Sequence, residues 1–231
     1  MFYSWAVACL LGTLYVLPVR AADFTGYGVL TSDYVYRSVT YSDGHGAIQV
    51  AVDLDFDSGF YAGVWGSSVD LSGGPTRQRD LELSYYLGFN HEWRRKWIVG
   101  ANVVAYTFPD TRGDVDYDYF EYSLVGNYDD RVWLEYSWSP DLIHSGADTH
   151  NLELYAEWPL PAGFMLGTGA GYYDTSELTG IGYGYWQAGI TRAFGIVDLD
   201  LRYHDTNRAV PIISTPKGAD ARLVLSARIP F

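Results

Sequence analysis

From residue 22 onward, the sequence consists of segments of about 10 to 14 residues in which apolar and polar side chains alternate. Successive side chains of a β-strand point to opposite faces, so this alternation indicates strands with one apolar and one polar face. About twelve segments of this kind follow one another. The expected strands cover residues 24–37, 47–57, 60–70, 81–90, 97–108, 117–128, 132–138, 152–158, 164–173, 181–194, 196–204 and 221–231.

The last segment, RLVLSARIPF, keeps its apolar face to the final residue, Phe231. Such a face must be covered either by a core or by lipid. The composition favours lipid, because 17% of the residues are aromatic, with 21 Tyr and 8 Trp, as expected where hydrocarbon meets water. The mean hydropathy is only −0.08, and no internal run reaches the roughly 18 apolar residues of a membrane helix. Any crossing of a membrane must therefore use strands.

The connections between the segments alternate in length. Short turns at 57–59, 92–96, 129–131, 160–163 and 194–195 alternate with longer polar loops such as SPDLIHSGADTH and DTNRAVPIISTPKG. Outer-membrane barrels have this pattern, with the short turns on the periplasmic side. We predict an all-β fold, a transmembrane antiparallel up-and-down β-barrel of about twelve strands in which the last strand pairs with the first. The alternative is a soluble β-sandwich or ligand-holding barrel, which would have to bury its aromatic and leucine-rich faces.

Residues 1–21 are predicted to be a signal peptide, and residues 22–231 the barrel. An apolar stretch over 5–17 ends at Pro18, and Val19 and Ala21 supply the small residues that precede a cleavage site. The single cysteine, Cys9, would be removed with the signal, so the mature chain would contain no thiol. These features predict export to the outer membrane of a Gram-negative bacterium, with membrane lipid as the surroundings of the barrel.

The chain is acidic, with 28 Asp and Glu against 15 Lys and Arg and a net charge of −13. Nucleic acid is therefore not an expected partner. The faces opposite the apolar ones carry most of the charge, and a charge facing hydrocarbon at mid-depth costs about 2–4 kcal/mol. We expect the lumen to be lined by Asp53, Asp55, Glu82, Glu121, Glu135, Glu153, Glu157, Asp198, Asp200, Arg202, His204, Arg222 and Arg228.

A wet lumen with this excess of acids would concentrate cations. Alternatively, the charges pair across a filled barrel that conducts nothing. Barrels of about eight strands are filled by their own side chains and those of 16–18 are open, so twelve strands leave both possibilities.

Catalysis is not expected, although the eleventh segment carries a group of polar residues that ends in His204 and Asp205. Outer-membrane hydrolases place acids and His near the outer rim, and His144 and Asp141 of a long loop could approach the same region. The sequence has no serine nucleophile elbow and no His or Cys spacing for a metal. Its glycine-rich stretches GTGAGYY and LTGIGYGYW lack the helix that phosphate binding requires. We predict no enzyme activity, cofactor or metal, and keep a rim hydrolase as the least favoured alternative.

The loop over 206–219 is unusually apolar, with Val210, Pro211, Ile212 and Ile213. It either folds inward as a constriction or packs against a neighbouring molecule.

The stretch SDYVYRSVTYSDGHGAIQVAVDLDFDSGFYAGVWGSSVD, residues 32–70, resembles the opening block of the TorF-type porin family, also labelled Gcw_chp. The resemblance rests on the aromatic-Val-aromatic-Arg run that ends at Arg37, the Asp43-Gly44 loop, Gln49, and the hairpin around Trp65. It implies an outer-membrane barrel with a channel role, and it makes Arg37, Gln49 and Trp65 candidate functional residues. The chain departs from the family pattern at Ser38 and Tyr41, where Gly and Gln are common.

The terminal Phe231 also resembles the signature that the β-barrel assembly machinery reads, which makes that machinery an expected partner. Taken together, we expect a narrow diffusion channel for small polar or cationic solutes. A non-conducting structural or adhesive barrel is the main alternative. The solute and the oligomeric state are left open.

Overall fold

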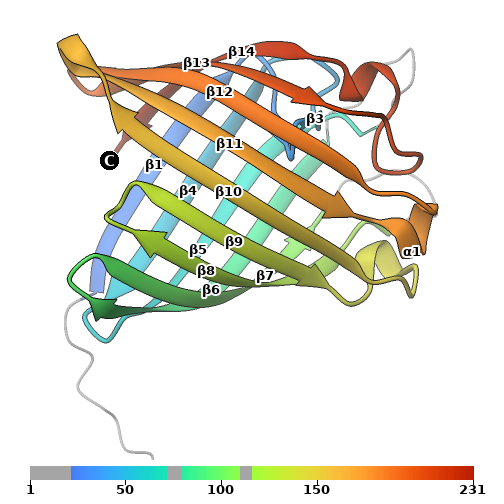
Figure 1. Ribbon diagram of the computed structural model, residues 1–231, viewed down its shortest axis with the longest axis horizontal. Coiled ribbons are helices and arrows are strands. Elements are labelled where there is room, and N and C mark those ends of the chain that lie inside the picture. The colour runs from blue at the N-terminus through green and yellow to red at the C-terminus, as the bar shows by residue number, and fades with distance from the viewer. Residues whose placement is uncertain (1–21, 72–79, 110–115) are drawn as a thin grey trace, which may run out of the picture.

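A computed structural model describes residues 22–71, 80–109 and 116–231. The predicted signal peptide lies outside these residues. Twelve antiparallel strands form a closed barrel in which β1 pairs with both β4 and β14, so the predicted fold is confirmed (Figure 1). The barrel strands are β1 (Ala22–Thr31), β4 (Ala47–Phe56), β5 (Phe60–Val69), β6 (Asp80–Arg94), β7 (Trp97–Thr107), β8 (Tyr119–Tyr128), β9 (Val132–Ser139), β10 (Thr149–Pro159), β11 (Phe164–Asp174), β12 (Tyr183–Phe194), β13 (Val197–Thr206) and β14 (Arg222–Pro230).

The alternating pattern explains why these segments form the wall. On β14, Leu223 and Leu225 are exposed on the outside, whereas Val224 between them is buried. On β6, Tyr85, Leu87 and Phe89 are exposed in the same way. An outer belt of large apolar side chains therefore surrounds the barrel, as expected of a wall that faces lipid. Within the described residues, no helix is long and apolar enough to cross a membrane.

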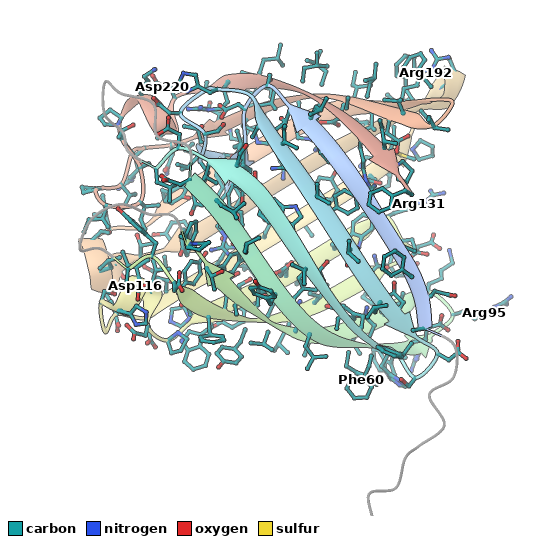
Figure 2. The ribbon with its side chains drawn as sticks, turned by 180° about the vertical axis from the view of Figure 1, so that it is seen from behind. Phe60, Arg95, Asp116, Arg131, Arg192 and Asp220 are labelled. Atoms are coloured by element: carbon teal, nitrogen blue, oxygen red, sulfur yellow. The ribbon has the colours of Figure 1, made fainter. Side chains whose placement is uncertain are left out.

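The two ends of the barrel differ. The short turns and the C-terminus lie at one end and the longer connections at the other, which we call the short-turn end and the long-loop end (Figure 1). The long connections contain small elements: α1 (Ser176–Thr179), η1 (Leu142–His144) and η3 (Lys217–Ala219). Figure 2 shows Arg95, Arg131 and Arg192 at the short-turn end and Asp116 and Asp220 at the long-loop end.

The first strand is shorter than predicted. The sequence pattern indicated a strand over 24–37, but β1 ends at Thr31, and the chain then forms a separate two-stranded hairpin of β2 (Val35–Tyr36) and β3 (Val39–Thr40). Arg37 and Ser38 form its tip with φ of 48° and 60°. Positive φ at both central residues is the requirement of a type I′ hairpin turn, which ordinarily favours Asn and Gly. Because the hairpin strands also alternate with period two, the pattern could not distinguish them from the wall.

The glycines of GTGAGYY allow a tyrosine ring to lie against the inner wall. Tyr185 on β12 reaches past Gly171 on β11, and its hydroxyl donates to Glu153 Oε2 on β10 at 2.9 Å. A Cβ atom on Gly171 would overlap the Tyr185 ring. The close approach of the Tyr185 ring, rather than phosphate binding, explains why position 171 is a glycine.

Replacing Gly171 with alanine is expected to lower the free energy of unfolding by about 1–3 kcal/mol, because the added methyl group displaces the Tyr185 ring. Urea unfolding of the protein in lipid vesicles, followed by tryptophan fluorescence, would measure this. The matched control is Gly126→Ala on β8, where a Cβ would meet nothing within 4 Å. Equal stability of the two variants would contradict the close-approach explanation.

Candidate functional site: a hairpin inside the barrel

The β2–β3 hairpin spans the lumen. Arg37 at its tip donates from Nη2 to Glu121 Oε2 on β8 at 2.7 Å, and its guanidinium lies 4.4 Å from the ring centre of Tyr173 on β11. Ser38 Oγ donates to the carbonyl of Trp186 on β12 at 3.1 Å. The hairpin leaves the wall between β1 and β4. The strands that its tip contacts, β8, β11 and β12, are not neighbours of β1 or β4 in the barrel. The hairpin must therefore cross the interior.

The tip carries a buried ion pair. The side chains of Arg37 and Glu121 are only 5% and 4% exposed. Burying two charges costs several kcal/mol for each ion, and the mutual attraction repays this only when the geometry is good. The short contact and the stacking of Arg37 on the rings of Tyr36 and Tyr173 supply that geometry. The pair therefore fixes where the hairpin sits.

The base of the hairpin is tied to β14 through Asp33. This carboxylate accepts from Thr40 Oγ1 at 2.5 Å, from Ser42 Oγ at 2.8 Å and from Arg222 Nη1 at 2.6 Å. Arg222 also donates from Nη2 to the carbonyls of Lys217 and Gly218 in the β13–β14 connection. One arginine thus joins the hairpin, the wall and a long loop.

A third anchor is Tyr34, whose hydroxyl donates to Glu82 Oε1 on β6 at 3.3 Å. Burial, and then the negative charge of Glu82, raises the pKa of Tyr34 well above its ordinary value. The Tyr34 hydroxyl donates to the carboxyl group of Glu82. The ring also packs 5.3 Å from that of Trp65, measured between ring centres.

The apolar loop over 206–219 folds inward. Val210 is fully buried in a cluster with Val39 of the hairpin and with Tyr173, Tyr183 and Tyr185 of the wall. Ile213 packs against the same cluster. Of the four apolar residues in this loop, Val210 and Ile213 pack inward next to the hairpin, whereas Pro211 and Ile212 are exposed. The inward interpretation therefore holds for part of the loop, and a constriction stays a prediction.

An inner cavity of about 230 Å³ lies beside the base of the hairpin. Two residues of the family motif, Gln49 and Trp65, line it together with Arg202 and His204. The third motif residue, Arg37, lies apart from them at the tip. Sequence reasoning found these residues and included Tyr34 in the motif without assigning it a role, but it missed Asp33. Both Asp33 and Tyr34 line the cavity and attach the hairpin to the wall.

Most of the acids expected in the lumen accept hydrogen bonds from side chains on the same or a nearby strand. Glu153 accepts from Tyr185 and Gln187, and Asp200 accepts from Arg202 Nη2 at 2.9 Å and Thr191 Oγ1 at 2.6 Å. The remaining contacts join Asp53 to Tyr86, Glu135 to Ser137, and Glu157 to Tyr155.

The other expected lumen residues lie toward the short-turn end. Asp198 is opposite Arg228 in the β13–β14 register, and the Arg228 guanidinium lies 4.2 Å from the ring centre of Tyr27. Asp55 is opposite Asp23 on β1 and Tyr61 on β5.

The groups considered for rim catalysis are not assembled into one site. His204 lines the inner cavity, and its Nδ1 has no hydrogen-bond partner among the described residues. His144 instead contacts Asp116 Oδ2 at 3.3 Å and Asp141 Oδ2 at 3.8 Å, and its side chain is exposed. Among the residues that the structure describes, no group of three or more His, Cys, Asp or Glu is placed to hold a metal ion.

A closed antiparallel barrel with a polar interior and an outer apolar belt is an outer-membrane-type β-barrel, and its architecture is that of porins. The structure is similar to the KdgM porin in complex with disordered oligogalacturonate, at a TM-score of 0.56 and 7% identity over 90% of this chain and 99% of that one. It is also similar to the NanC porin, at a TM-score of 0.52 and 10% identity over 90% and 98% of the two chains. At these identities the likeness establishes the fold.

The chain belongs to the family of bacterial proteins of unknown function designated Gcw_chp, whose family model matches residues 19–224. This confirms the Gcw_chp resemblance, while the narrower TorF designation stays a prediction. Among curated proteins, no sequence matches this chain.

Proposed function

We propose that the protein is a narrow channel of the outer membrane that passes small polar or cationic solutes. The observation that carries this proposal is a closed barrel whose inner side is polar and mostly acidic. Acidic walls in a confined aqueous path raise the local concentration of cations. The acids hydrogen-bonded along β8 to β13, such as Glu153 and Asp200, would provide that field.

The hairpin determines how narrow the path is. With its tip held against β8 and β12 and its base against β14, a solute would have to pass beside it. The inner cavity of about 230 Å³ beside the hairpin base provides room for a small solute.

The same hairpin favours a second candidate function, a non-conducting structural or adhesive barrel. The hairpin and the β13–β14 connection pack against each other and against the wall through Val210 and Ile213. If these contacts never open, the lumen stays closed.

The test of conduction is single-channel current from the purified protein in a planar bilayer under a KCl gradient. We expect small discrete steps and a reversal potential that favours K⁺. Glu157→Gln should shift that potential toward zero, because the amide keeps a partner for Tyr155 but removes a charge. The absence of current steps from a folded protein would instead support the non-conducting barrel.

We also propose that β14 is the segment recognised by the β-barrel assembly machinery. Support comes from the way the chain end closes the barrel. The backbone of Phe231 exchanges hydrogen bonds of 2.8 and 3.0 Å with Gly26 on β1. Closing the barrel requires that the assembly machinery bring β14 into register with β1.

A further inference from the structure

A second cavity, of about 270 Å³, lies at the long-loop end. Residues of the hairpin, of β8, β11 and β12, and of long connections line it together. Six tyrosines contribute to its wall: Tyr36, Tyr41, Tyr117, Tyr119, Tyr173 and Tyr183. Leucine and isoleucine side chains of the connections complete an apolar lining. Its size is slightly below the range of about 300–1,000 Å³ typical of drug-sized ligand sites, so it suits a smaller molecule.

The charge of the lining is acidic. Asp43 and Asp70 line the cavity, and none of its described lining residues is Lys, Arg or His. Asp43 lies 4.0 Å from Lys217 Nζ, but that lysine side chain is 80% exposed, and such loose surface pairs contribute little. The positive charge of Arg37 is balanced by Glu121 within the hairpin contact. A cation entering the cavity would therefore meet the Asp43 carboxylate and aromatic rings, of which Tyr36 and Tyr173 already stack against Arg37.

The backbone around the cavity is strained. Among its lining residues, Ile143 and Ile212 have φ of 50° and 72°, which β-branched residues rarely adopt. Asp43 also has a positive φ, of 51°. Strain of this kind persists only where the surrounding structure enforces it, and it is concentrated at ligand sites.

We propose that this cavity binds a small organic cation with an apolar or aromatic body. Tyrosine faces attract quaternary and primary ammonium groups through their negative quadrupole. The carboxylate of Asp43, 25% exposed, adds charge selectivity at the lining. The site is independent of conduction, since binding requires only the folded barrel.

The test is isothermal titration calorimetry of the folded protein in dodecyl maltoside with benzyltrimethylammonium as the probe. Benzyl alcohol and phenylacetate serve as neutral and anionic analogues, and detergent without protein gives the blank. We expect saturable binding of the cation alone. No saturable heat with the wild-type protein, or equal binding of the three probes, would overturn the proposal.

Two variants test the assigned residues. Asp43→Asn should weaken binding about tenfold, because it removes the charge while Asn tolerates the left-handed backbone. Tyr117→Leu should weaken it about fivefold, since it keeps apolar bulk but removes a π face. The matched control is Asp220→Asn, an equal loss of charge at the same end of the barrel outside the cavity (Figure 2).

Each variant is first checked for the heat-dependent gel mobility of a folded barrel. Unchanged affinity in both folded Asp43→Asn and folded Tyr117→Leu would show that the probe binds elsewhere. An equal loss in Asp220→Asn would indicate a general surface-charge effect instead of this cavity.

Discussion

Arg37→Ala is expected to release the hairpin from the barrel interior. The substitution leaves Glu121 buried without its partner, and breaking one side of a buried ion pair costs about 3–5 kcal/mol. It also removes the stacking on Tyr36 and Tyr173, at 4.7 and 4.4 Å from the ring centres. The twelve-strand wall does not depend on this contact, so the barrel should remain closed while the hairpin leaves the lumen.

Two measurements follow this release. Limited chymotrypsin digestion should cut the variant after Tyr34, Tyr36 or Tyr41, which are packed inside the wild-type barrel. Single-channel conductance should rise, because the hairpin would no longer narrow the path.

The matched control is the double variant Arg37→Met with Glu121→Gln, which removes both charges and keeps similar bulk. Replacing a whole buried pair in this way is often neutral or stabilising. The double variant should therefore resist chymotrypsin. An Arg37→Ala protein that resists chymotrypsin and conducts like the wild type would show that the ion pair does not hold the hairpin.

Leu201→Arg is expected to lower the free energy of unfolding by about 2–4 kcal/mol, the cost of a basic side chain at mid-depth on a lipid-facing wall. Leu201 lies near the middle of β13 and is 47% exposed. Its cross-strand neighbours are Ile190 on β12 and Leu225 on β14, which are exposed as well. An arginine at this position would enter a continuous apolar belt.

Urea unfolding in phospholipid vesicles measures this cost. Leu201→Met is the control, because a volume-conserving apolar exchange usually costs less than about 1.5 kcal/mol. If the arginine variant were as stable as the methionine variant, Leu201 would not face hydrocarbon.

Much of the fold could be predicted from the sequence because the wall obeys one local rule. Each strand must present apolar side chains to lipid and mostly polar ones inward. On β14, Leu223 and Leu225 therefore alternate with Arg222 and Ser226, although the inward Val224 between them is apolar. The alternation of short and long connections then gives the strand count and the two ends. The predicted pairing of the last strand with the first is confirmed by the register between β14 and β1.

The interior could not be predicted in the same way, because its contacts join residues that are far apart in the sequence. Tyr34 and Arg37 continue the alternation of the first strand, yet the chain leaves the wall at Thr31. Their partners, Glu82 and Glu121, were expected only to line the lumen.

The six tyrosines of the cavity at the long-loop end likewise come from four separate parts of the chain. Sequence by itself determined the wall, since a strand's two faces are set by its own residues and by the solvent on each side. Only the tertiary structure decided what fills the lumen. A buried charge or ring takes the position where closing the barrel brings its partner within reach.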